Sequence, residues 1–156
     1  MAEKEKFKIA PEGDGKKPFG NKESRKLFDR SETFFNKMRE EGGITLSTKD
    51  PAVLSATKSL AHALYFYLYL HKDEESRNMI NLFSLAQKAI QNENEDSNKT
   101  ELYTLISQVE KEDKDDPCVC FYHIFDSARV SVKKDAVTIL LYLILNYRAD
   151  YGIGRI

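Results

Sequence analysis

The chain has 156 residues, of which 41% are apolar and 31% are charged, and its formal net charge is −1 at pH 7. This length accommodates one domain, and nine phenylalanines and eight tyrosines supply enough apolar surface for a real core. With seven glycines and four prolines, the composition argues against a turn-rich β-sandwich. The near-zero net charge excludes a global electrostatic attraction to nucleic acid.

Basic and acidic side chains are concentrated in different segments of the chain. Residues 1–30 carry nine lysines and arginines against six acidic residues, whereas residues 91–116 carry three against nine. Residues 117–156 are slightly basic again, with five against three. A local basic surface is therefore compatible with the neutral total.

The N-terminal segment, residues 1–22, combines lysines with glycine and proline and has few apolar residues at regular spacing. This composition predicts a disordered, lysine-rich tail, followed by a single helical domain over residues 23–156. Within the tail, Gly15–Lys22 has the glycine spacing of a phosphate loop. However, Asn21 stands where the lysine should follow and no apolar strand precedes it, so no nucleotide cofactor is expected.

Apolar residues at helical spacing predict two helices in the first half of the chain. The first covers Ser24–Glu41 and is ended by two glycines. The second begins at Pro51, after the capping residue Asp50, and runs to about His71. Its end, Ala63–Leu70, is apolar on nearly every face, so we expect it to be buried in a bundle or against a partner.

Three more helices are predicted beyond a charged turn. The third covers roughly Glu74–Ile90, and the polar stretch Gln91–Lys99 then forms a loop. Thr100 can cap the fourth helix, and Pro117 starts the fifth, over residues 118–130. The residues expected to point inward from the fourth and fifth helices are Leu102, Tyr103, Leu105, Ile106, Val109, Phe121, Tyr122, Ile124, Phe125 and Ala128.

The last predicted helix covers about Ser131–Ala149. Its β-branched residues, Val137, Thr138 and Ile139, leave a strand as a minor alternative, but its length favours a helix and no second strand is available for pairing. The uncharged run Ala136–Leu145 is shorter than the about 20 residues that span a bilayer, so we expect a central bundle helix. The predicted fold is an all-α bundle of five or six helices.

The cysteines and histidines are the candidates for metal binding or catalysis. Cys118 and Cys120 are badly placed for a mutual disulfide in a helix, and no signal peptide precedes them, which indicates a reducing, cytoplasmic setting. Together with His123 they offer soft metal ligands, but the second ligand pair of a structural zinc site is missing, so apolar packing is favoured. His62 lies among small residues, and His71 can favour the helix dipole. No catalytic, cofactor or metal site is predicted.

Four basic residues, Arg129, Lys133, Lys134 and Arg148, are grouped around the last predicted helix, after an acidic loop. We predict that they form a basic patch that contacts a partner. The alternative interpretation is ordinary surface charge.

The order of these segments between Asp50 and Tyr147 resembles the all-α domain of the coupling ATPases of conjugative type IV secretion, especially the type found in Gram-positive mobile elements. The resemblance is in the helices and in the residues between them. The matching positions are Asp50-Pro51, Glu74-Glu75 with Asn78, the segment from Leu105 to Asp116-Pro117, and Ser131–Thr138.

The resemblance implies a non-catalytic recognition domain that binds a relaxase, an accessory transfer protein or DNA during conjugation. The family's tryptophan after Asp-Pro is absent, and so are its phosphate loop and acidic strand, so the relation concerns the helical domain alone. The alternative is a small cytoplasmic adaptor or regulatory protein that acts only through protein–protein contacts. An enzyme with an unrecognised site is the third hypothesis.

Overall fold

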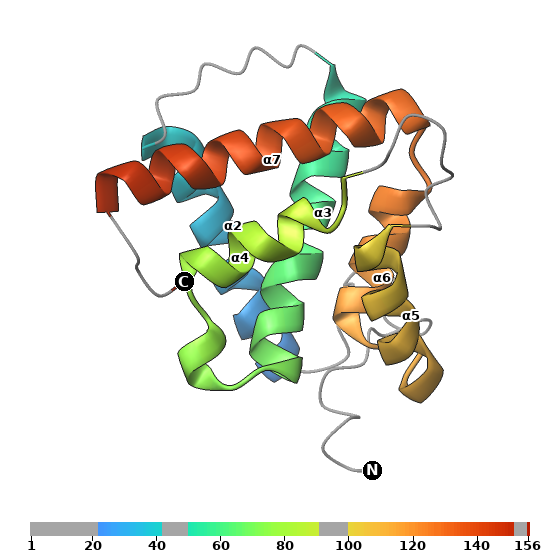
Figure 1. The fold of residues 1–156 in the computed structure, drawn as a ribbon. Helices are drawn as coiled ribbons and strands as arrows, with labels where there is room; N and C mark the ends of the chain where they lie inside the picture. The colour runs from blue at the N-terminus through green and yellow to red at the C-terminus, as the bar shows by residue number, and fades with distance from the viewer. Residues whose placement is uncertain (1–21, 42–49, 91–99, 152–155) are drawn as a thin grey trace.

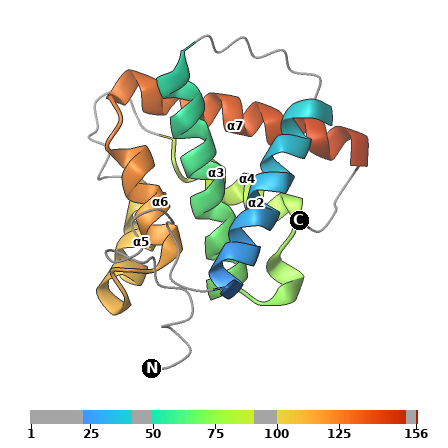
Figure 2. The same ribbon diagram turned by 180° about the vertical axis from the view of Figure 1, so that it is seen from behind.

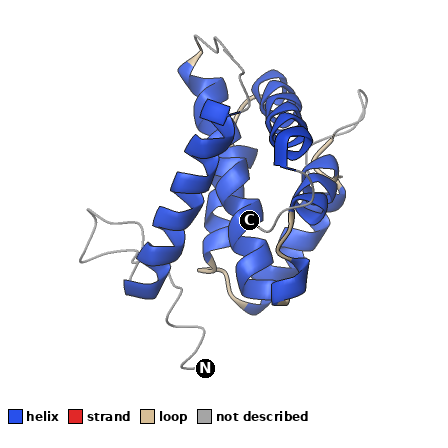
Figure 3. Cartoon of the chain, turned by 90° about the vertical axis from the view of Figure 1, so that its left-hand side faces the viewer, coloured by secondary structure: helices blue, strands red, loops and turns tan. Residues whose placement is uncertain are grey.

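The computed structural model describes residues 22–41, 50–90, 100–151 and 156, and this part of the chain folds into helices without any strand (Figure 1 and Figure 3). The all-α fold is therefore confirmed, with six α-helices among the described residues. The predicted tail and the predicted loop at residues 91–99 lie outside these residues, except that Lys22 begins the first helix. The elements are α2 (Lys22–Glu41), α3 (Pro51–His71), the 3-10 turn η1 (Glu74–Ser76), α4 (Met79–Gln87), α5 (Glu101–Glu112), α6 (Pro117–Asp126) and α7 (Val130–Tyr151).

Side-chain caps set the starts of two helices where the sequence predicts them. The backbone N–H of Ala52 donates to Asp50 Oδ1 (2.9 Å), with proline at the first position of α3. Thr100 Oγ1 accepts from the N–H of Tyr103 (3.0 Å) at the start of α5. Each cap satisfies a backbone donor that the first turn of a helix leaves without a partner.

The third predicted helix begins later than expected. Asp73 caps the short turn η1, and the chain then becomes extended at Asn78, whose Oδ1 accepts from the N–H of Asn81 (2.9 Å). This second cap starts α4 at Met79 rather than at Glu74. Because two polar caps compete within six residues, the segment forms a turn and a short helix in place of one long helix.

The fifth predicted helix ends earlier than expected, and one of its residues points outward. The chain leaves α6 after Asp126, and Ile124 is 51% exposed. Helix α6 packs against α3 and α5 with its other faces, and Ile124 and Ser127 are both exposed. Ile124 is therefore not a core residue.

Helix α3 occupies the centre of the molecule. It contacts α2, α4, α6 and α7, and every residue from Ser59 to Leu68 is buried (Figure 1 and Figure 2). A helix that is apolar all round needs neighbours on all sides, and these four helices provide them. The expected burial of Ala63–Leu70 is confirmed up to Leu68, and Tyr69 and Leu70 are half-buried.

Helix α7 is not central, although its apolar run predicts this. It runs across α2 and α3, as both views of the ribbon show, and it buries one face while the other stays exposed (Figure 1 and Figure 2). Helix α3 occupies the central position and is surrounded by other helices, so α7 packs on the outside of the bundle. Its buried residues are Lys133, Ala136, Val137, Leu140, Leu143 and Ile144.

A buried histidine joins α2 to α3. His62 Nε2 lies 3.1 Å from Glu32 Oε1, and Nδ1 lies 2.6 Å from Ser31 Oγ. Because an ionised carboxylate only accepts hydrogen bonds, Nε2 donates to Glu32 and Nδ1 accepts from Ser31. Glu32 Oε2 also pairs with Lys58 Nζ at 2.8 Å. Burial lowers the pKa of His62 to about 4, against the opposing effect of Glu32.

Truncating core leucines should destabilise the fold. Leu64 and Leu140 are fully buried, on α3 and α7. We expect Leu64→Ala and Leu140→Ala each to lower the free energy of unfolding by about 2–5 kcal/mol, from lost apolar burial and the cavity left behind. Urea denaturation measures this change. The exposed control Ile124→Ala should cost under about 1 kcal/mol, and equal effects at all three positions would contradict the described core.

Stability should fall on mild acidification because of His62. Its pKa is about 4 in the folded chain against an ordinary value of 6.5, so the unfolded chain binds more protons between these values. The contribution of neutral His62 to the free energy of unfolding is complete above about pH 6.5. About 2 kcal/mol of this free energy should be lost between about pH 7 and pH 5. Urea denaturation of wild type and His62→Gln at both pH values tests this. Identical pH dependence in the two proteins would rule out a depressed pKa at His62.

Candidate functional site

The basic residues predicted to form a patch are divided between the surface and the interior. Arg129, between α6 and α7, and Lys134, on α7, are exposed. Lys133 is buried, and its Nζ lies 3.1 Å from Asp126 Oδ1 and 3.3 Å from the Asp126 carbonyl oxygen. Lys133 therefore ties the start of α7 to the end of α6 and is not part of an exposed basic surface. Arg148 lies in α7, but its side chain is outside the described residues.

The exposed face of α7 combines apolar and polar side chains. Tyr142 is 58% exposed and Leu145 is 44% exposed, and Lys134 and Thr138 precede them at one-turn intervals. This spacing places the four residues on one side of the helix. Single exposed apolar residues are common, but here two large ones occupy successive turns. We call these four residues the outer face of α7.

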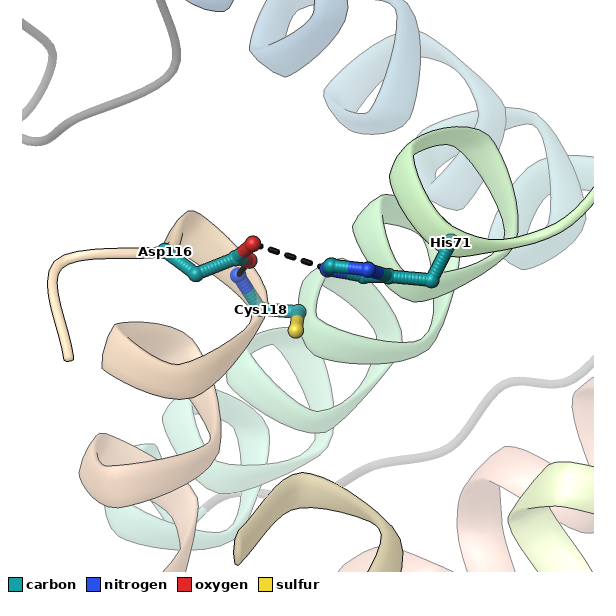
Figure 4. Close-up of side chains that lie close together, drawn as sticks. All are labelled: His71, Asp116 and Cys118. Atoms are coloured by element: carbon teal, nitrogen blue, oxygen red, sulfur yellow. Dashed lines mark hydrogen bonds and ion pairs between the residues drawn. The ribbon is translucent and has the colours of Figure 1, made fainter. Parts of the chain in front are cut away.

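A second group of polar side chains lies where α3 ends and α6 begins. His71 closes α3, Asp116 caps α6, and Cys118 follows in the first turn of α6 (Figure 4). His71 Nε2 lies 2.8 Å from Asp116 Oδ2, and the N–H of Cys118 donates to Asp116 Oδ1 at 2.9 Å. The donor atoms of the three side chains all lie within 4.8 Å of one another. We call this group the His71–Asp116–Cys118 cluster.

The cluster is mostly withdrawn from solvent. Cys118 and Asp116 are buried, whereas the His71 side chain keeps 27% of its surface exposed. Burial raises the pKa of the Cys118 thiol far above its usual range, and the neighbouring Asp116 carboxylate raises it further. The thiol is therefore protonated and unreactive at neutral pH unless a cation compensates the charge of its thiolate.

The ligand set considered from sequence spacing is not the one that the fold assembles. Among the described residues, Cys118 meets His71 and Asp116, whereas His123 Nε2 lies 3.1 Å from Glu110 Oε1. Cys120 is a half-buried free thiol, and its pKa is raised to about 11 by burial and then by the acidic residues before α6. The cluster escapes sequence reasoning because His71 and Asp116 are 45 residues apart.

A cavity of about 300 Å³ lies beside the cluster, between α3, α4 and α5. Its wall includes Tyr67, whose ring centroid is 5.6 Å from that of His71, so Tyr67 borders the cavity and also contacts the cluster. Lys72 and Lys88 line it as well, and Lys88 Nζ lies 3.2 Å from Glu101 Oε2. The volume is at the lower end of the range for small-molecule sites.

No family model, curated protein or solved structure matches the chain. None of the helices in the described ranges is long and apolar enough to cross a bilayer.

Two adjacent lysines should differ sharply in their contribution to stability. Lys133→Ala leaves the half-buried Asp126 carboxylate without its cation, so we expect the free energy of unfolding to fall by about 1–3 kcal/mol. Lys134→Ala removes an exposed side chain and should change it by no more than about 0.5 kcal/mol. Urea denaturation of both variants measures the difference. Equal effects would mean that the Lys133–Asp126 pair does not hold α6 and α7 together.

Proposed function

We propose that this chain is a non-catalytic recognition domain of conjugative DNA transfer, and that it binds a relaxase or an accessory protein of the DNA-processing complex. The all-α fold agrees with the resemblance to the helical domain of the coupling ATPases. Positions that carry the resemblance are helix caps in the structure: Asp50 caps α3, Asn78 caps α4 and Asp116 caps α6. The shared pattern therefore coincides with the helix boundaries of one bundle.

The outer face of α7 is the observation that carries the proposal. Tyr142 and Leu145 present apolar surface that no helix in the described ranges covers, and Lys134 and Thr138 border it. Aromatic side chains beside polar ones are typical of the anchor residues of protein interfaces. A protein partner that covers this face would bury both apolar side chains and leave the polar ones at the rim.

A protein partner fits the charge distribution better than DNA does. A DNA-binding surface needs several exposed cations, each of which contacts a phosphate. Near the α6–α7 junction, the described exposed cations are Arg129 and Lys134, and the exposed acidic residue Asp135 lies next to Lys134. Lys133 is engaged with Asp126 inside the fold. We therefore propose a protein as the direct ligand, and the binding experiment includes DNA as the other possible outcome.

The same face also supports the alternative function, that of an adaptor or regulatory protein outside conjugation. Tyr142 and Leu145 would anchor any protein of complementary shape. The identity of the partner separates the two functions, because the first requires a component of the transfer machinery.

Binding to purified relaxase and accessory transfer proteins tests the proposal. We expect Tyr142→Ala and Leu145→Ser each to weaken the complex at least about tenfold, since both remove an apolar anchor. Calorimetric titration or pull-down measures the change. Ile124→Ser, on the exposed face of α6, is the matched control and should bind like the wild type.

Two other outcomes contradict parts of the proposal. Tight DNA binding that weakens steeply with salt and is lost in Lys134→Glu would make DNA the ligand. Failure of every transfer component to bind would leave the adaptor function in its place.

A further inference from the structure

We propose that the His71–Asp116–Cys118 cluster binds a divalent transition metal ion of the zinc class. The cluster supplies an imidazole nitrogen, a carboxylate oxygen and a thiol sulfur, the three donor types that zinc takes in proteins. The three donor atoms are already within 4.8 Å of one another. Bonds of about 2.0–2.3 Å to one ion require donors about 3–4 Å apart, so small side-chain movements are enough. This inference does not depend on the proposed function.

The three side chains lie close together where α3 ends and α6 begins. Figure 4 shows His71 and Asp116 pointing toward each other, with the sulfur of Cys118 beside the line between them. The two carboxylate oxygens of Asp116 have different partners. Oδ1 accepts from the N–H of Cys118 and caps α6, and Oδ2 faces His71. The carboxylate can therefore coordinate through Oδ2 while the cap stays in place.

Charge balance also favours a divalent ion in this position. Asp116 and Cys118 are buried next to each other, and a thiolate beside a carboxylate would place two negative charges in a site of low polarity. Asp116 Oδ2 lies 2.8 Å from His71 Nε2, within hydrogen-bond distance. One divalent cation, one carboxylate, one thiolate and a neutral imidazole sum to zero charge, which removes the penalty for burying two anions.

The binding step balances with the loss of one proton. The metal ion takes the place of the proton on Cys118 Sγ, which is released to solvent. His71 coordinates through Nε2, and the proton that Nε2 shares with Asp116 moves to Nδ1, so the imidazole remains neutral. Because His71 is partly exposed, a fourth position stays open to water, the arrangement of zinc sites with three protein ligands.

Cobalt(II) is the probe for the test, because a cobalt–thiolate bond absorbs in the near ultraviolet and zinc does not. The full chain, kept reduced, is titrated with Co²⁺ at about pH 7.5, where the competing proton is scarce. We expect saturable absorption with one ion per chain, which Zn²⁺ abolishes. Cys118→Ser should remove the thiolate band, and His71→Gln should weaken binding at least about tenfold. The matched controls Cys120→Ser and His123→Gln should keep both.

Thermal unfolding with Zn²⁺ supplies a second readout that does not depend on a buried substitution. An ion that binds the folded chain raises Tm by mass action. We therefore expect a rise in wild type and a smaller rise in His71→Gln, which alters a partly exposed residue. A Kd of about 1 mM is the weakest affinity of interest. The proposal is therefore wrong if Co²⁺ up to about this concentration gives no thiolate band. It is also wrong if the band persists in Cys118→Ser, or if Tm rises equally in both proteins.

Discussion

The burial of α3 on all of its faces is the constraint on which the rest of the structure depends. Its residues from Ser59 to Leu68 leave no side for solvent, so α2, α4, α6 and α7 have to surround it. His62, a buried polar side chain among them, needs partners inside the core, and Ser31 and Glu32 of α2 provide them. A buried donor or acceptor left without its hydrogen-bond partner costs about 1–3 kcal/mol, so His62 sets where α2 lies along α3.

The packing of α6 on α3 creates the polar cluster. The two helices run antiparallel, because Phe121 stacks on Phe66 while Asp116 meets His71 at the end of α3. The start of α6 needs a cap, and the end of α3 carries an imidazole that needs a partner. Asp116 serves both groups, and the packing brings the Cys118 thiol to the same place. A structural capping residue thereby becomes part of a candidate metal centre.

Helix α7 has one side that packs in the bundle and another that is exposed. Lys133 faces inward and pairs with Asp126, whereas its neighbour Lys134 faces outward with Tyr142 and Leu145. Adjacent residues on a helix are about 100° apart around its axis, so a short basic sequence seldom forms a single basic surface. For this chain, the exposed side of α7 is therefore more apolar and less cationic than its sequence suggests.

The sequence by itself determined the all-α class, the bounds of α3 and the starts of α5 and α6, because periodicity and side-chain caps act within a few residues. The competition between the caps Asp73 and Asn78 is equally local, but it is decided by small energy differences that residue patterns do not rank. Only the tertiary structure decided that α3 rather than α7 is central, that Lys133 is buried, and that His71 meets Asp116 and Cys118. These outcomes depend on which helices pack together, and a helix with several apolar faces does not specify its neighbours.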